Sequence, residues 1–431
     1  MVASTLEVGR LTQPVSLPIR KAMVVGIGNA LEFYDFLVFS YFAIQIGHTF
    51  FPASQTSHGL LYSLATFGLG FITRPLGGIV IGTYGDRLGR KPAMMLSFSL
   101  MGLSIVGLAV TPSFAQIGIA APVLLLVFRL IQGFALGGEV GPSTAFLVEA
   151  APVNRRGFYL SIQYATQGMA ILAGGIVGFI LSSVMTQASL ESFGWRIAFL
   201  LGAAVVPVGL YIRSKLPETL HDSRDLTSSA AMRPRIPPRV MLLGVLMFGA
   251  MTITTYALNY MNTYAQDTLN LVTHAAFGST ITLGLCFMLA APVGGFLSDR
   301  FGAKRVMLTA LATLLVLVVP GYLILNRYPS VTTLYGVTAV LSLVAQVSSV
   351  AVMVAIAETL PKAVRSAAIA TLYAVAIAIF GGTAQFIIKW LGDATQSPMV
   401  PAWYLTGALV IGGLAMLGFR TSAARAVGGP S

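Results

Sequence analysis

Long apolar runs, separated by short polar or Gly/Pro-containing segments, follow one another along almost the whole chain. A helix needs about 20 apolar residues to cross a bilayer. Runs of that length begin near Ala22, Gly59, Ala93, Gly118, Gly157, Trp195, Val240, Ala275, Val306, Thr332, Ser366 and Ala402. The polar–apolar alternation of barrel strands is missing. The pattern predicts an all-α membrane protein with 12 transmembrane helices.

Two short polar motifs occur twice, in the same order. The motif Gly85-Asp86-Arg87-Leu88-Gly89-Arg90 returns as Ser298-Asp299-Arg300-Phe301-Gly302-Ala303, at an offset of 213 residues. A second pair, Glu149 to Arg156 and Glu358 to Arg365, has an offset of 209 residues. Both offsets are close to half of the chain, which predicts two copies of a six-helix unit. The expected division is a cytoplasmic segment 1–21, an N-terminal half 22–214, a cytoplasmic linker 215–239, a C-terminal half 240–420 and a cytoplasmic tail 421–431.

Composition and charge support a membrane protein and give its orientation. Hydrophobic residues make up 56% of the chain, charged residues 9%, and the mean hydropathy is +0.83, which excludes an ordinary soluble domain. The net charge of +12 is scattered over short loops and does not form a nucleic-acid-binding face. Assigning the even-numbered loops and both termini to one side collects 21 of the 26 Lys and Arg residues there, so both termini are expected in the cytoplasm and the protein in the inner (plasma) membrane. No cleaved signal peptide is expected, and Cys286, the single cysteine, excludes an intrachain disulfide.

The first predicted span carries two acids. Asn29, Glu32 and Asp35 are spaced by three and share one helical stripe. A charge at the bilayer centre costs about 2.5–3.5 kcal/mol on insertion scales, so these acids must face the protein interior or a wet cavity. They form either a structural pair near the cytoplasmic end or a group that carries protons.

Two arginines also fall inside predicted spans. Arg74 needs an acid or an anionic substrate as partner, and the alternatives are a permanent pair with Glu32 or Asp35 and direct substrate contact. Arg129 and Gln132 share a face of the fourth span. Glu139 lies further along this span, where it either takes part in proton coupling or pairs with another helix end.

Neutral polar side chains in the other spans complete the candidate substrate site. Amides in a span either orient a carboxylate or hydrogen-bond a neighbouring helix. Tyr164 and Tyr373 occupy equivalent places in the two repeats. The candidate neutral residues are Asn29, Gln132, Gln163, Tyr164, Gln167, Tyr256, Asn259, Tyr260, Gln346 and Tyr373. With the in-span charges in the first half, we expect that half to handle protons and the substrate's charge, and the second half to shape the pocket.

Three motifs resemble those of a known family. Gly-Asp-Arg-x-Gly-Arg-Lys at residue 85 is similar to the signature loop of the major facilitator superfamily. Asn-x-x-Glu-Phe-Tyr-Asp-Phe from Asn29, followed by Arg-Pro-Leu-Gly-Gly from Arg74, resembles its metabolite:proton symporter branch. The segment from Arg129 to Pro142 resembles the helix-4 motif, whose Arg is associated with proton coupling. Members of this branch move citrate and related carboxylates, 2-oxoglutarate, aromatic acids, or betaine and proline.

The resemblance implies the major facilitator fold and alternating access around a site near the midplane. The repeated loops would close the cytoplasmic side. The candidate gate residues are Asp86, Arg87, Arg90, Glu149, Arg156, Asp299, Arg300, Arg305, Glu358 and Arg365. The candidate proton-coupling residues are Glu32, Asp35, Arg129 and Glu139.

The expected function is proton-coupled import of a small organic anion, a di- or tricarboxylate such as citrate. An aromatic acid, a zwitterionic osmolyte such as betaine or proline, and proton-driven export are alternatives. A non-transporting receptor is disfavoured by the short termini. No catalytic constellation, metal cluster or cofactor loop emerges, so we expect no enzyme activity and no cofactor, with the proton as coupling ion. We expect a monomer in the lipid bilayer.

Overall fold

The computed structural model describes residues 29–30, 33–52, 58–88, 90–137, 144, 147–148, 151–214, 236–361 and 364–419. Helices are the regular secondary structure throughout these residues. In the first half, residues 33–50 form the first membrane helix, of which α2 (Ala43–Phe50) is the last part. The others are α3 (Gly59–Leu69), α4 (Arg74–Leu88), α5 (Arg90–Val110), α6 (Phe114–Ile117), α7 (Ala120–Leu136), α9 (Arg156–Val184), α10 (Gln187–Ser189) and α11 (Trp195–Ser214).

The second half has the same kind of organisation. Its helices are α13 (Pro238–Asn259), α14 (Met261–Asp267), α15 (Thr273–Phe301), α16 (Ala303–Arg327), α17 (Val331–Thr359), α18 (Arg365–Ala376), α19 (Gly382–Thr395) and α20 (Val400–Gly418). A π turn, Ile377–Gly381, joins α18 to α19, and a second π turn, Leu190–Gly194, precedes α11.

The hydropathy pattern located these helices well. Eleven of the twelve predicted starts lie within three residues of the start of a described helix, and the twelfth, Ala22, lies outside the described residues. Eight described helical stretches are long and apolar enough to cross a membrane, and two shorter apolar helices are Met95–Val110 and Ala120–Leu136. The prediction of an all-α membrane protein is confirmed. The domain boundaries stay a prediction, because the linker is outside the described residues from 215 to 235.

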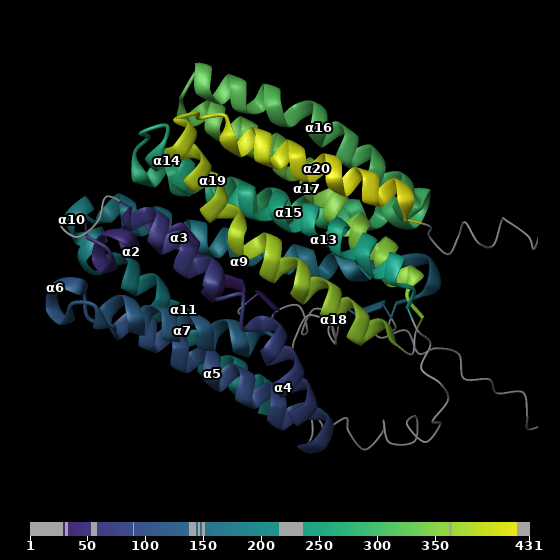
Figure 1. Ribbon diagram of the computed structural model, residues 1–431, viewed down its shortest axis with the longest axis horizontal. Coiled ribbons are helices and arrows are strands. Elements are labelled where there is room, and N and C mark those ends of the chain that lie inside the picture. The colour runs from purple at the N-terminus through teal and green to yellow at the C-terminus, as the bar shows by residue number, and fades with distance from the viewer. Residues whose placement is uncertain are drawn as a thin grey trace, which may run out of the picture.

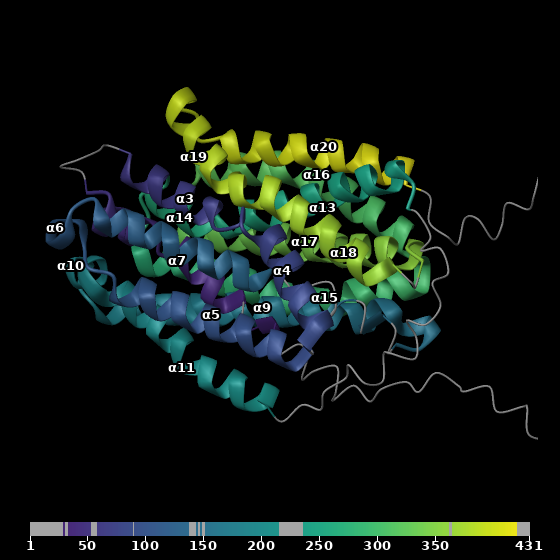
Figure 2. The same ribbon diagram turned by 60° about the horizontal axis from the view of Figure 1, so that its bottom comes forward.

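The two halves pack against each other along two long helix pairs. In Figure 1 the helices after residue 236, coloured teal-green to yellow, occupy the upper part of the view except for α18, which reaches down toward α4, and α15 runs beside α9 at the boundary. The second pair is α3 with α19. Figure 2 shows α20 and α11 at opposite edges of the molecule. The boundary between the halves therefore runs through the middle of the helix bundle.

Small residues allow the close helix contacts that place the polar groups. A Cβ added at Gly137 of α7 would lie 2.1 Å from the carbonyl oxygen of Arg74, and one at Gly77 would lie 1.8 Å from the carbonyl oxygen of Phe134. Because glycine has no side chain at these two positions, α4 and α7 can come close together. This approach brings Arg74 and Arg129 to the same region.

Candidate functional site

Arg129 lies in an aromatic cage at the centre of the first half. Its side chain is fully buried, and its guanidinium carbon is 4.3, 4.4 and 5.1 Å from the ring centroids of Phe36, Phe39 and Phe67. Nη1 donates to Oε1 of Gln132, and Nη2 donates to the carbonyl oxygen of Phe67 at 3.4 Å. The ring faces stabilise the cation. Within the described part of the chain, no carboxylate pairs with Arg129, and Nε of Arg129 and Nε2 of Gln132 have no hydrogen-bond partner.

Arg74 reaches from the first half to the second. Its side chain is 4% exposed, and its guanidinium carbon lies 5.5 Å from the centroid of the Tyr373 ring in α18. Tyr373 packs edge-on against Phe248 of α13, with centroids 5.8 Å apart. Among the described residues, no carboxylate pairs with Arg74. A second buried cation is therefore placed at the boundary.

Tyr256 of α13 connects the two arginines. Its ring packs against Phe67 and Phe71, with centroid separations of 5.9 and 5.5 Å, and it lies within electrostatic range of both Arg74 and Arg129. We call Arg74, Arg129, Tyr256 and Tyr373 the central group. These four residues come from α4, α7, α13 and α18, so the group joins both halves.

Tyr164 and Gln346 border the central group. The Tyr164 hydroxyl lies 3.5 Å from Sδ of Met251 and within electrostatic range of Tyr373. Nε2 of Gln346 donates to the carbonyl oxygen of Tyr164 at 3.5 Å. The equivalence of Tyr164 and Tyr373 in the repeat thus corresponds to proximity in space.

Asn29 and Asp35 of the first membrane helix face other helices of the first half. Nδ2 of Asn29 donates to the carbonyl oxygen of Gln163 at 3.2 Å and to Oγ1 of Thr166 at 3.3 Å. Asp35 is 3% exposed and faces α11, where a Cβ added at Gly202 would lie 1.9 Å from its Oδ1. In the described structure this oxygen has no hydrogen-bond partner, and Asp35 forms no ion pair with Arg74 or Arg129.

Other candidates lie apart from the central group. Oε1 of Gln163 accepts from Thr144 at 2.8 Å, and Oδ1 of Asn259 accepts from the Tyr41 hydroxyl at 2.6 Å. Gln167 is partly buried on α9. Tyr260 lines a separate cavity of about 250 Å³ at the end of the second half, together with Lys389 and Asp393. Glu32, Glu139 and Glu149 lie outside the described residues.

Several neighbours of the site were not among the predicted residues. The caging rings Phe36, Phe39 and Phe67 were missed because phenylalanine in an apolar span is ordinary core composition; only the spacing of three between Phe36 and Phe39 marks a shared face. Gln385 was a second omission. It accepts from Ser40 at 2.8 Å and donates to the carbonyl oxygen of Tyr256 at 3.2 Å, which ties the first membrane helix to α19 and α13.

The described gate candidates lie at the opposite end of the bundle from the Tyr260 cavity. Asp299 of α15 accepts from the backbone N–H groups of Gly157 and Phe158 at 2.7 and 2.9 Å. A carboxylate there also interacts favourably with the N-terminal end of α9. Asp299 therefore joins the second half to the first.

The remaining gate candidates differ in burial. Glu358 lies within electrostatic range of Arg156 and Arg365, and Arg365 is buried and donates to the carbonyl oxygen of Leu360 at 3.1 Å. The Arg300 guanidinium carbon lies 5.3 Å from its neighbouring Phe301 ring, while Arg87, Arg300 and Arg305 are exposed. Asp86 and Arg90 lie in α4 and α5, and their side chains are outside the described structure.

Comparison with known proteins agrees with this architecture. Residues 21–233 match the family described as "Sugar (and other) transporter". The chain is 33% identical over 419 residues to a citrate-proton symporter of Klebsiella pneumoniae, covering 96% of this chain and 94% of that one. It is 34% identical over 398 residues to the alpha-ketoglutarate permease of Escherichia coli strain K12, covering 90% and 91%. The proline/betaine transporter of the same strain is 28% identical, with 91% and 82% covered.

A solved structure shows the same fold. A D-xylose-proton symporter superposes with a TM-score of 0.72, at 19% identity, over 93% of this chain and 97% of that one. The chain belongs to the major facilitator superfamily of membrane transporters, in its sugar and metabolite transporter family. The resemblance seen in the motifs is confirmed. The chain is a multi-pass membrane transporter and not an enzyme.

Proposed function

We propose that the protein is a proton-coupled secondary transporter that imports a small organic anion, a di- or tricarboxylate such as citrate, by alternating access. The observation that carries this proposal is the pair of buried guanidinium groups in the central group, neither of which pairs with a carboxylate in the described structure. Burying an unpaired charge is costly, so an anionic substrate between the halves would offset that cost.

The central group has the chemistry to bind a carboxylate. Guanidinium groups bind carboxylates through two parallel N–H···O bonds, which give both affinity and orientation. The hydroxyls of Tyr256 and Tyr373 supply further donors, and Nε of Arg129 and Nε2 of Gln132 are donors without a described acceptor. The citrate-proton symporter and the alpha-ketoglutarate permease are named for carboxylates, which supports this substrate class.

Asp35 is the described carboxyl group best placed to carry the proton. It is buried in the first membrane helix and faces α11 without an ion-pair partner among the described residues. Protonation would remove a charge from this apolar position, and release of the proton would restore it. Glu32 and Glu139 remain further candidates. A membrane potential of 100 mV would supply about 2.3 kcal/mol for each charge moved.

Alternating access would exchange two sets of contacts between the halves. On the side of Tyr260, the contacts are Ser40 with Gln385, Tyr41 with Asn259, and Nδ2 of Asn262 with the carbonyl oxygen of Tyr41 at 3.1 Å. On the side of Glu358, Asp299 binds the start of α9. With both termini in the cytoplasm of an inner-membrane protein, the first set faces outward and must break to admit substrate.

A zwitterionic osmolyte is the second candidate substrate. The Arg129 region is surrounded by four aromatic rings, those of Phe36, Phe39, Phe67 and Tyr256. Aromatic faces bind quaternary ammonium groups as they bind a guanidinium. The proline/betaine transporter is a relative of this kind. The carboxylate of such an osmolyte would bind Arg74 and Arg129.

Uptake into proteoliposomes tests the proposal. Radiolabelled citrate, succinate, benzoate and betaine are offered in parallel, with and without an imposed inward pH gradient. We expect a carboxylate to accumulate only when the gradient is present. Accumulation of betaine alone would select the second candidate. Loss of preloaded substrate under the opposite gradient, with no uptake, would refute import.

A further inference from the structure

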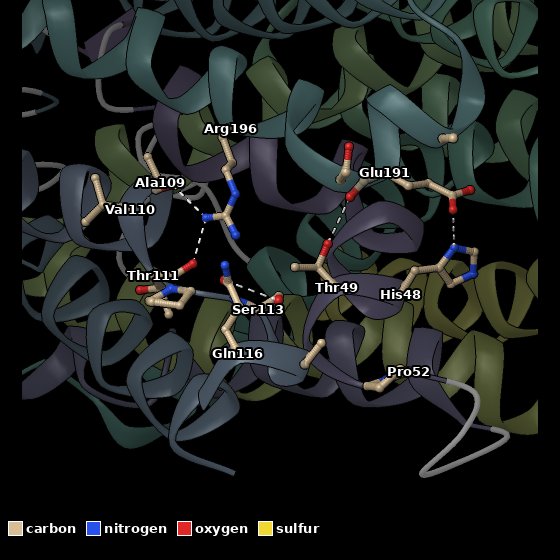
Figure 3. A pocket seen from close by; sticks show the side chains of 14 residues that line it. His48, Thr49, Pro52, Ala109, Val110, Thr111, Ser113, Gln116, Glu191 and Arg196 are labelled. Atoms are coloured by element: carbon tan, nitrogen blue, oxygen red, sulfur yellow. Dashed lines mark hydrogen bonds and ion pairs between the residues drawn. The ribbon is translucent and has the colours of Figure 1, made fainter. Parts of the chain in front are cut away.

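A second polar cavity lies in the first half, at the helix ends opposite Asp299. It has a volume of about 820 Å³ and shares no residue with the central group. Its walls are the end of α2, the segment from Ala109 to Gln116, and the residues from Ala188 to Arg196, as Figure 3 shows. Cavities of this volume hold small-molecule ligands in many proteins. With the topology proposed above, it faces outward.

Arg196 is held rigidly in one wall of this cavity. Its Nη1 donates to the carbonyl oxygens of Ala109 and Thr111, both at 2.7 Å, at the end of α5. Its guanidinium carbon lies 4.4 Å from the centroid of the Trp195 ring and 5.9 Å from that of Phe50. Both hydrogen bonds use the same nitrogen of the group. In the described structure Arg196 has no carboxylate partner, so Nε and Nη2 remain as donors.

Gln116 adds a second donor next to Arg196. Its Oε1 accepts from the backbone N–H of Ser113 at 2.9 Å, which fixes the amide and leaves its NH₂ group to donate. Figure 3 shows the Gln116 side chain directed toward the guanidinium of Arg196. Gln116 is exposed and Arg196 is partly buried, so two donor groups from different segments of the cavity wall can share one acceptor.

The acidic residue of the cavity, Glu191, lies away from the Arg196 guanidinium in Figure 3. Glu191 pairs with Nδ1 of His48 at 3.3 Å and accepts from Nε2 of Gln187 at 2.7 Å. Thr49 donates to the carbonyl oxygen of Glu191 at 3.0 Å and separates this pair from Arg196 in Figure 3. The Glu191 carboxylate is therefore bound by its own partners and not by Arg196.

We propose that this cavity is a second binding site, which takes a small carboxylate through Arg196 and Gln116 and is distinct from the central group. Guanidinium and amide donors from two adjoining segments of the wall match the planar, two-oxygen acceptor of a carboxylate. An anion held in this cavity raises the local concentration of substrate on the side from which the proposed import takes the substrate up.

Trp195 provides a direct readout of binding. It is one of three tryptophans, and Trp390 and Trp403 are exposed on other helices. In the Trp390→Phe/Trp403→Phe background, citrate is titrated into purified protein in nanodiscs while the fluorescence of Trp195 is recorded. We expect a saturable change, weakened about 10-fold by Arg196→Gln because the two-point contact is lost. Arg327→Gln, an exposed arginine at the end of α16, is the matched control and leaves the affinity unchanged.

Two further variants make the result decisive. Because Arg196 also binds the end of α5, Gln116→Ala is measured beside it and should weaken binding about 3-fold, as expected for one neutral hydrogen bond. Arg129→Leu removes the central group's caged cation and should leave the Trp195 signal intact. The proposal is overturned if no saturable signal appears, or if the signal is lost with Arg129→Leu and kept with Arg196→Gln. Either result leaves the uptake test of the central group unaffected.

Discussion

The two halves share one helical plan but differ in the polar groups that they bury. In the first half the described buried residues include three charges inside membrane helices, Asp35, Arg74 and Arg129. In the second half the corresponding region holds neutral groups, Thr252, Asn259, Gln346 and Gln385 among them. Its one buried charge among the described residues, Arg365, lies at the start of α18 and is not part of the central group. Among the described residues, the two copies of the six-helix unit have thus come to differ: the first buries charges inside its membrane helices, and the second buries neutral polar groups there.

This difference has an electrostatic reason. Charges placed close together in a medium of low dielectric interact strongly and compete for the same partners. When all the charges belong to one half, the distances between them stay the same while the other half moves. The neutral hydroxyls and amides of the second half can gain and lose contacts at a much smaller cost.

The largest effect should come from Arg129. In Arg129→Leu the caged cation and its two described hydrogen bonds disappear, and each such bond to a charged group contributes about 1.5–3 kcal/mol, so the initial rate of citrate uptake should fall at least about 100-fold. Arg129→Lys keeps the charge but not the planar fork and should recover part of the rate. Arg327→Gln is the matched control. Retention of a third of the rate in Arg129→Leu would contradict the comparison.

The next effect concerns coupling. In Asp35→Asn the side chain cannot exchange a proton, so the ratio of internal to external citrate at steady state should fall to about one under an inward pH gradient. Exchange of internal for external citrate should continue, because it needs no net proton movement. Counterflow and net accumulation, measured in the same vesicles, separate these two properties. A variant that still accumulates citrate would move the proton to Glu32 or Glu139.

Arg74 and Tyr373 test the contact between the halves. Arg74→Gln should raise the KM for citrate about 10-fold, since one charge-assisted contact is lost. Tyr373→Phe keeps the ring that faces the guanidinium and should change KM by less than about 3-fold. Initial rates over a range of citrate concentrations measure both. Equal losses in the two variants would show that the hydroxyl, and not the ring, is the important partner.

The smallest effect is expected in the second half. Gln346→Ala removes a neutral donor to the Tyr164 carbonyl oxygen, which contributes about 1 kcal/mol. The preference among citrate, succinate and betaine should shift by a few fold, while the dependence of uptake on the pH gradient stays as in the unchanged protein. Competition assays at two external pH values give both quantities. A loss of pH dependence would break the division between the halves.

The sequence located helices and motifs better than side-chain directions. Hydropathy placed α3 and α11 at their observed starts, since a membrane helix is set by length and composition alone. Side-chain direction depends on every residue between two points. Asp35 was one possible partner of Arg74, and it faces Gly202 of α11 in the structure. Such a choice is made by helix packing, which one chain's periodicity does not contain.

Tyr260 illustrates the same limit at a helix break. Helical spacing from Tyr256 places Tyr260 one turn further on the same face. In the structure α13 ends at Asn259 and α14 begins at Met261, and Tyr260 lines the cavity with Lys389 and Asp393. Tyr256, four residues earlier, belongs to the central group. Two tyrosines four residues apart on one polar stretch therefore contribute to two different regions.

The π turn Ile377–Gly381 has a consequence for how one helix serves two partners. A π turn accommodates one residue more than an α turn, and one residue corresponds to about 100° of rotation around an α-helix. The residues of α19 are thus rotated relative to those of α18. Tyr373, before the turn, meets Arg74, while Gln385, after it, meets Ser40 and Tyr256. The turn therefore changes the helical register between α18 and α19. If it lay beyond Gln385, that residue would be rotated by about 100° relative to its present partners.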